Sequence, residues 1–199
     1  TQAQVRVQGH AIEARICAET PDNDFLPATG SFHVMRIPLA QRFTTGTVRW
    51  DSGVRAGDEI SPYYDSMIAK LIVHGDTREQ ALARLDQALS ELHIVGVANN
   101  VGFLRQVVRS PSFAQAQLDT ALIEREKHLL FHQHTLPLAL AVASAMAHGL
   151  AKEAPRGNAW VDPWSQTDGW LMQGQSLRKF DYVCGDETGV ALLTRHSHG

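Results

Sequence analysis

The stretch MIAKLIVHGDTREQALARLDQALSEL, residues 67–92, changes its hydrophobic period halfway along. Its first seven residues form a short apolar run that ends at His74-Gly75, a pattern typical of a buried strand. From Thr77 onward the apolar residues fall at helical spacing, and the charged residues lie mostly on the other face. Thr77 and Gln80 form a capping-box pattern, in which the threonine hydroxyl accepts a free backbone N–H. We therefore predict a strand over residues 67–73 and a helix over residues 77–92.

Further strands and a second helix are expected on both sides of this stretch. Residues 9–19, GHAIEARICAE, alternate between apolar and polar side chains, the period of a half-buried strand. TGTVRW, residues 45–50, is another strand candidate, in which Arg49 stands between apolar neighbours. Residues 93–97 predict a strand, and residues 99–108 predict a helix. The fold class that follows is α+β, a mixed or antiparallel sheet with flanking helices.

The charge balance argues against nucleic acid and anionic membranes as partners. The 199 residues carry 18 Lys and Arg against 21 Asp and Glu, a net charge of −3. Neither nucleic acid nor an anionic membrane would be attracted overall, so neither is expected as a partner.

Cys17 and Cys184 form neither a metal-ligand spacing nor a disulfide framework, which favours a reducing, cytosol-like compartment. The chain opens TQAQVRVQGH, without an initiator Met or a targeting segment, and we expect an interior part of a longer polypeptide.

The C-terminal third begins with a long stretch that lacks charged residues. Residues 128–151 contain no Asp, Glu, Lys or Arg. Its run of apolar residues is too short for a membrane span, which needs about 20 such residues. We predict instead an apolar helix over residues 136–152, which must be wrapped by other protein. Short strands are expected after it, and two or three of them cannot enclose a helix. We therefore divide the chain into residues 1–126 and a truncated second unit, residues 127–199.

The polar residues of the expected strands offer few catalytic motifs. The sequence has no glycine-rich phosphate loop, nucleophile elbow or zinc motif, and we predict no metal site. Arg49 either pairs with a neighbouring carboxylate such as Asp51 across the sheet or clamps an anionic ligand. Glu13 and Arg15 share one strand face, and they either form a site with Arg49 or pair with each other. Lys70 is interpreted as snorkelling to the strand edge.

Several long segments together resemble a known family. The segments are GHAIEARICAE, DFLPATG, VRWDSGVRAGDEISPYYDSMIAKLIVHG, TREQALARLDQAL and IVGVANNVGFL. They resemble the C-terminal region of biotin carboxylase, the module that closes the ATP-grasp portion of biotin-dependent carboxylases, from about residue 7 to residue 124. GNAWVDPWSQTDGW is similar to the α subunits of methylcrotonyl-CoA carboxylases, in which a helix surrounded by a β-barrel joins the α subunit to its carboxyltransferase partner. The second unit would then be a truncated helix-plus-β-barrel tethering domain.

The resemblance implies roles for four residues. In the family, ATP phosphorylates bicarbonate, and the released CO2 is captured at N1 of biotin. Arg49 matches the arginine that holds biotin and stabilises its enolate-like anion, a role that suits a preorganised cation. Glu13 and Arg15 match an E-x-R strand beside the active-site sheet, which implies supporting roles. Arg78 matches a position near the surface by which some biotin carboxylases pair, which makes it an interface candidate.

The resemblance also implies what lies outside this sequence. The nucleotide-binding lysines, the glycine-rich lid and the magnesium-binding glutamates of the family lie upstream. ATP and Mg²⁺ would thus be bound mainly by residues outside this segment. The A-M-K-M motif that carries biotin lies downstream, so biotin would be attached elsewhere in the full chain. We therefore expect this segment to be inactive by itself.

The expected biological role follows from the second, shorter match. It favours an α subunit of 3-methylcrotonyl-CoA carboxylase, an enzyme of leucine degradation, with a carboxyltransferase β subunit and a biotinyl carrier domain as partners. The alternatives are an α subunit of propionyl- or acetyl-CoA carboxylase, or a non-catalytic subunit-assembly module. The expected location is the bacterial cytoplasm, or the mitochondrial matrix if the source is eukaryotic.

Overall fold

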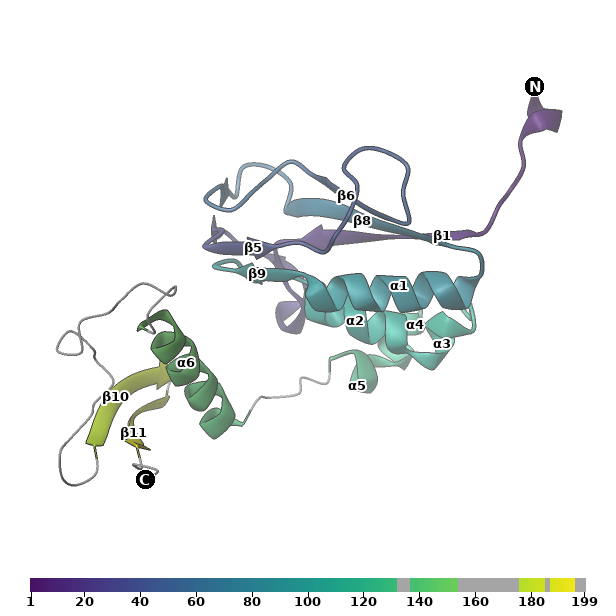
Figure 1. Cartoon of the computed structure of the whole chain (residues 1–199). Coiled ribbons are helices and arrows are strands. Elements are labelled where there is room, and N and C mark those ends of the chain that lie inside the picture. The colour runs from purple at the N-terminus through teal and green to yellow at the C-terminus, as the bar shows by residue number, and fades with distance from the viewer. Residues whose placement is uncertain (132–136, 154–175, 185–186, 196–199) are drawn as a thin grey trace. The chain divides into compact units, whose positions relative to one another are not determined.

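The computed structural model describes residues 1–131, 137–153, 176–184 and 187–195. The chain divides into two compact units, Thr1–His132 and Gln133–Gly199 (Figure 1). The boundary expected after residue 126 falls between two short helices of the first unit, α4 (Leu122–Arg125) and α5 (Lys127–Leu130).

A three-stranded antiparallel sheet forms the centre of the first unit. Its middle strand is β8 (Met67–Gly75), which pairs with β1 (His10–Cys17) on one side and with β6 (Val48–Ser52) on the other. Both strand edges of β8 are therefore hydrogen-bonded, and none of its residues is exposed. The strands expected over residues 9–19, 45–50 and 67–73 are confirmed.

Three short antiparallel ladders and two single-turn 3-10 helices complete the strand-rich half of the unit. The ladders pair β2 (Glu19–Thr20) with β3 (Leu26–Pro27), β4 (Gly30–Ser31) with β7 (Glu59–Ile60), and β5 (Val34–Arg36) with β9 (His93–Val95). The 3-10 helices are Gln2–Gln4 and Pro21–Asn23. Every strand pair among the described residues is antiparallel, so an α+β unit with an antiparallel sheet and flanking helices is confirmed.

Helix α1 (Arg78–Glu91) covers one face of the sheet. The hydroxyl of Thr77 accepts the backbone N–H of Gln80 at 3.3 Å, as the capping pattern predicts. The reciprocal bond differs, because the Gln80 carboxamide oxygen accepts the N–H of Asp76 at 3.1 Å instead of that of Thr77. The predicted helix is confirmed, with Thr77 and Leu92 as its caps.

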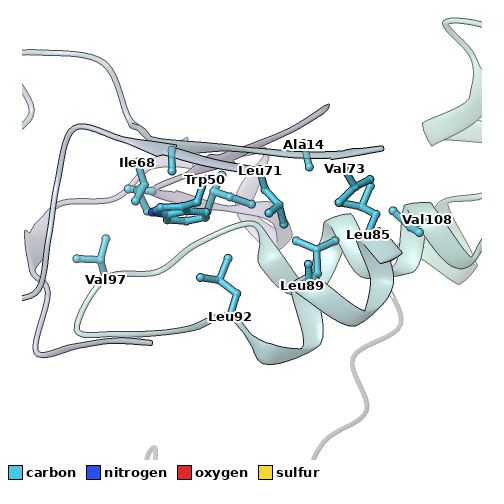
Figure 2. Packing of buried hydrophobic residues seen from close by; sticks show 14 of the residues in the cluster. Ala14, Trp50, Ile68, Leu71, Val73, Leu85, Leu89, Leu92, Val97 and Val108 are labelled. Atoms are coloured by element: carbon cyan, nitrogen blue, oxygen red, sulfur yellow. The ribbon is translucent and has the colours of Figure 1, made fainter. Parts of the chain in front are cut away.

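The hydrophobic core lies between the sheet and α1. Figure 2 shows Leu71 and Val73 reaching from β8 toward Leu85 and Leu89 of the helix, with Trp50 in the same cluster, and all five residues are at most 2% exposed. Helices α2 (Val101–Arg109) and α3 (Pro111–Ala114), together with α4 and α5, lie on the same side of the sheet as α1 (Figure 1). No described helix of the first unit covers the opposite face.

An ion-pair network joins α1 to α2. Asp86 accepts hydrogen bonds from Arg105 Nε at 3.2 Å and from Arg109 Nε and Nη2 at 2.9 and 2.8 Å. Burial acts to raise the pKa of the Asp86 carboxyl, but the hydrogen bonds from Arg109 and Arg105 outweigh it and hold the pKa below its ordinary value of 3.8. The network is therefore strongest when Asp86 is ionised.

Substituting Asp86→Asn is expected to lower the free energy of unfolding at neutral pH by about 1–2 kcal/mol. Because the folded-state pKa of Asp86 is depressed, its contribution is present above the ordinary carboxyl pKa and is lost as the pH falls through the folded value. Urea unfolding between about pH 7 and about pH 3 should show the gap to wild type closing on acidification. Asp119→Asn, in an exposed pair with Arg125, is the matched control. A gap that is independent of pH would contradict this account.

The second unit contains one helix and one hairpin among its described residues. Helix α6 (Leu138–Glu153) confirms the predicted apolar helix, and none of its described side chains is buried. Strands β10 (Ser176–Cys184) and β11 (Glu187–Arg195) form an antiparallel pair, longer than the short strands expected, and α6 contacts β10. The GNAWVDPWSQTDGW segment lies outside the described residues. No helix in the described part of the chain is long and apolar enough to cross a bilayer.

Candidate functional site

The face of the central sheet opposite α1 carries a set of charged side chains, which we call the charged face. Directly opposed residues of antiparallel strands point to the same face of a sheet. The strand register forms two rows across β1, β8 and β6: Glu13, Ile72 and Arg49 in one, and Arg15, Lys70 and Asp51 in the next. The structure thus brings the three residues expected near the active site, Glu13, Arg15 and Arg49, onto one face.

Arg49 is bound to a carboxylate on its own strand. Arg49 Nε donates to Asp51 Oδ2 at 2.7 Å, and Arg49 Nη2 lies 2.5 Å from the same oxygen. The other carboxylate oxygen, Oδ1, accepts the backbone N–H of Phe43 at 2.8 Å. The expected arginine–carboxylate pair therefore exists, but it runs along β6 between alternate residues and not across the sheet.

The pair keeps both of its members charged. The hydrogen bond from Arg49 lowers the pKa of Asp51 below its ordinary value, and the Phe43 N–H and the charge of Lys70 act in the same direction. The hydrogen bond to Asp51 in turn raises the pKa of Arg49, and the charge of Glu13 adds to this effect. Glu13 and Lys70 are therefore close enough to the pair to act on it electrostatically.

The other charges on this face have looser contacts. Arg15 Nε lies 3.4 Å from Glu13 Oε1, so these two residues pair with each other and also share the face of Arg49. Lys70 lies on the central strand, between Arg15 and Asp51. Lys70 is half-buried on this strand, and the expectation that its side chain reaches the strand edge stays a prediction.

Strand β1 is held in place by Asn100, a residue that sequence reasoning missed. Its Oδ1 accepts the N–H of Cys17 at 3.0 Å, and its Nδ2 donates to the carbonyl of Arg15 at 3.1 Å. These bonds bracket the irregularity in the β1–β8 register between Ile16 and Cys17. An asparagine just before a helix indicates an N-cap, but here the side chain makes no cap hydrogen bond.

Substituting Asn100→Ala is expected to lower the free energy of unfolding by about 1–3 kcal/mol. The buried side chain satisfies one backbone donor and one backbone acceptor of β1, and alanine leaves both without a partner. Urea unfolding followed by far-UV circular dichroism measures the change. Asn23→Ala, at an exposed position, should stay within about 0.5 kcal/mol of wild type. Equal effects of the two substitutions would contradict this role for Asn100.

Arg78, the interface candidate, lies away from the charged face at the start of α1. Its Nε donates to the carbonyl of Ala114 at 3.3 Å, and its Nη2 donates to the carbonyl of Phe113. Its Nη1 lies 3.1 Å from His10 Nε2, and the guanidinium stands over the Phe113 ring. These contacts tie α1 to α3 and β1 within one chain, and a contact with a second subunit stays a prediction.

Cys17, the last residue of β1, is the cysteine of the first unit. Burial raises the pKa of the Cys17 thiol to about 11, and the charges of Glu19 and Asp65 add to the rise, so the thiol stays protonated at neutral pH. The described residues hold no cluster of three or more His, Cys, Asp or Glu side chains that suits a metal ion.

The geometry of Arg49 suits the binding of an anion. Asp51 occupies the Nε and Nη2 edge of the guanidinium, and no described residue accepts a hydrogen bond from Nη1. The Arg49 side chain is 38% exposed, on a face that no described helix of the unit covers. A fixed cation with a free donor edge stabilises an oxygen on which negative charge develops.

Known proteins are similar to most of this chain, and the family match lies within the first unit. Residues 13–125 match the family model described as the biotin carboxylase C-terminal domain. The mitochondrial methylcrotonoyl-CoA carboxylase subunit alpha of Dictyostelium discoideum is 39% identical over 181 residues, which are 89% of this chain and 25% of that protein. The biotin carboxylase of a Nostoc strain is 42% identical over 124 residues, 62% of this chain and 27% of that protein.

Solved structures agree with these matches. The biotin carboxylase domain of the Hydrogenobacter thermophilus 2-oxoglutarate carboxylase, solved in complex with MgADP, ADP and bicarbonate, is similar with a TM-score of 0.60 and 32% sequence identity. The match covers 65% of this chain and 28% of that one. The chain thus spans about a quarter of the length of each of these three proteins.

Proposed function

Because the chain belongs to the biotin carboxylase C-terminal domain family, we propose that it forms the closing part of a biotin carboxylase, the unit that carboxylates biotin with ATP and bicarbonate. The observation that carries this proposal is Arg49, held by Asp51 on the helix-free face of the sheet, within the residues that match the family. ATP and Mg²⁺ would be bound mainly by parts of the protein outside this chain.

In the proposed reaction, ATP transfers its terminal phosphoryl group to a bicarbonate oxygen, and the carboxyphosphate formed breaks down to CO2 and phosphate. Biotin, bound elsewhere in the full chain, would supply the ureido nitrogen that takes up CO2, and the released phosphate would take the proton that this nitrogen loses. Arg49 would donate a hydrogen bond from its Nη1 edge to the oxygen that gains negative charge in this step. An exposed cation with a free donor edge fits an acceptor oxygen of this kind.

Glu13 and Arg15 would support Arg49 and not contact the reacting atoms. Both lie on β1, two strands away from Arg49, and the negative charge of Glu13 helps to keep Arg49 protonated. The positive charge of their neighbour Lys70 lowers the pKa of Asp51 and so helps to keep that carboxylate ionised. These residues would set the charge balance of the charged face.

The proposed acyl substrate of the full enzyme is 3-methylcrotonyl-CoA, which would place the protein in leucine degradation. The support is that the methylcrotonoyl-CoA carboxylase relative matches 89% of the chain, whereas the Nostoc biotin carboxylase matches 62%. An α subunit of propionyl- or acetyl-CoA carboxylase is the alternative. We propose the bacterial cytoplasm as the location, or the mitochondrial matrix for a eukaryotic source.

Residues 127–199 would begin the domain that tethers a carboxyltransferase β subunit, and a biotinyl carrier domain would follow. The support is α6, which is apolar on all sides and has no buried side chain among its described residues. Such a helix is stable in water when other protein surrounds it. A non-catalytic assembly module would use the same helix, so activity has to separate the two proposals.

Two measurements test the proposed function. The native polypeptide, blotted from its source cells with an antibody and with streptavidin, is expected to be much larger than 21.9 kDa and to carry biotin. That full-length protein should cleave ATP in a bicarbonate-dependent reaction with free biotin, and the 199-residue chain should not. A native polypeptide of this length without biotin would exclude the carboxylase proposal. Activity of the 199-residue chain would refute the argument that the nucleotide site lies elsewhere.

A further inference from the structure

Asp51 is less exposed than the arginine that it binds. Its side chain is 11% exposed, against 38% for Arg49, so the carboxylate is the more buried member of the pair. It has no free oxygen, since Oδ2 accepts from Arg49 and Oδ1 accepts the N–H of Phe43. A carboxylate with both oxygens bound in this way has a fixed position and orientation.

The loop that binds Asp51 is itself attached to β6. Gln41 donates its N–H to the carbonyl of Val48 at 3.0 Å, and its carbonyl accepts the N–H of Trp50 at 2.8 Å. Trp50 is buried in the core, so this attachment is anchored to the packed side of the sheet. Phe43, two residues after Gln41, has a φ of 52°, which turns the chain where its N–H meets Asp51.

We propose that Asp51 is a positioning residue that holds Arg49 by its Nε and Nη2 edge and so presents the Nη1 edge to the reacting oxygen. This inference rests on the proposed function of Arg49. An exposed arginine has four side-chain torsions and would otherwise sample many directions. Fixing one edge of the planar guanidinium sets the direction of the other edge before substrate arrives.

The test uses the full-length carboxylase with free biotin. Asp51→Asn is expected to lower kcat for biotin carboxylation about 10- to 100-fold, because a neutral side chain holds the guanidinium weakly. KM for ATP should stay within about twofold, since Asp51 acts on the biotin step. Asp51→Glu keeps a carboxylate that can reach the same edge, and it should restore activity to within about fivefold of wild type.

A double substitution separates positioning from a general structural role. If Asp51 acts through Arg49, adding Asp51→Asn to Arg49→Ala should cause no further loss of kcat. Asp119→Asn, in the exposed pair with Arg125, is the matched control and should leave all parameters unchanged. Additive losses, failure of Asp51→Glu to rescue, or wild-type activity of Asp51→Asn would each overturn the inference.

The same set of variants distinguishes failure of this inference from failure of the proposed function. If Arg49→Ala leaves biotin carboxylation intact, the proposed role of Arg49 is wrong, and the positioning of Arg49 has no catalytic meaning. If Arg49→Ala removes the activity and Asp51→Asn does not, the proposed function stands and the positioning role is overturned.

Discussion

Replacing Arg49 by alanine in the full-length carboxylase is expected to lower the rate of biotin carboxylation by about 100- to 1,000-fold, the usual loss when a preorganised donor to a developing negative charge is removed. Bicarbonate-dependent ATP cleavage without biotin should persist, because the nucleotide site is assigned to other parts of the protein. Steady-state assays of ADP release with and without biotin measure the two steps separately.

The arginine geometry makes this prediction specific. Arg49→Lys keeps the charge but cannot donate along one edge to Asp51 and along the other to an oxygen, so its activity should be intermediate. Arg36→Ala, at an exposed position on β5, is the matched control and should behave like wild type. Equal loss of both steps in Arg49→Ala would contradict a role in biotin carboxylation and would indicate a loss of structure.

Substituting Leu71→Ala is expected to lower the free energy of unfolding of the first unit by about 3–5 kcal/mol. Leu71 is fully buried on the middle strand, between the sheet and α1, where packed neighbours cannot collapse into the space left behind (Figure 2). Urea unfolding of the 199-residue chain, followed by far-UV circular dichroism, measures the change.

A leucine at the surface provides the control for this prediction. Leu39 is 96% exposed, so Leu39→Ala should change the free energy of unfolding by less than about 0.5 kcal/mol. The same chemical truncation is thus compared at two levels of burial. A cost below about 1 kcal/mol at Leu71 would contradict the packing of the sheet against α1.

The charged face could be predicted only in part. Strand alternation correctly places Glu13 and Arg15 on one side of β1, and Arg49 opposite its apolar neighbours on β6. The sequence pattern cannot say which strands are neighbours. The sheet order β1-β8-β6 inserts the last of the three strands between the other two. That order brings Lys70 between Arg15 and Asp51, which the periodicity of β8 did not indicate.

The role of Asn100 could not be predicted from local sequence at all. Its partners on β1 lie 83 and 85 residues away in the chain, so no local pattern connects them. The sequence around it indicates a helix start, and the helix does begin at the next residue. The side chain, however, satisfies the backbone of a distant strand, because the packing of α2 against β1 brings the two together.

Local pattern by itself determined the strand over residues 67–73, the helix over residues 77–92 and the apolar helix of the second unit, and all three are confirmed. These elements depend on hydrophobic period and capping, which act between residues a few positions apart. Tertiary structure decided which residues share the charged face, how Asp51 holds Arg49, and which strand Asn100 supports. Those contacts depend on strand order and on hydrogen bonds between distant segments, and their register is set when the sheet packs against its helices.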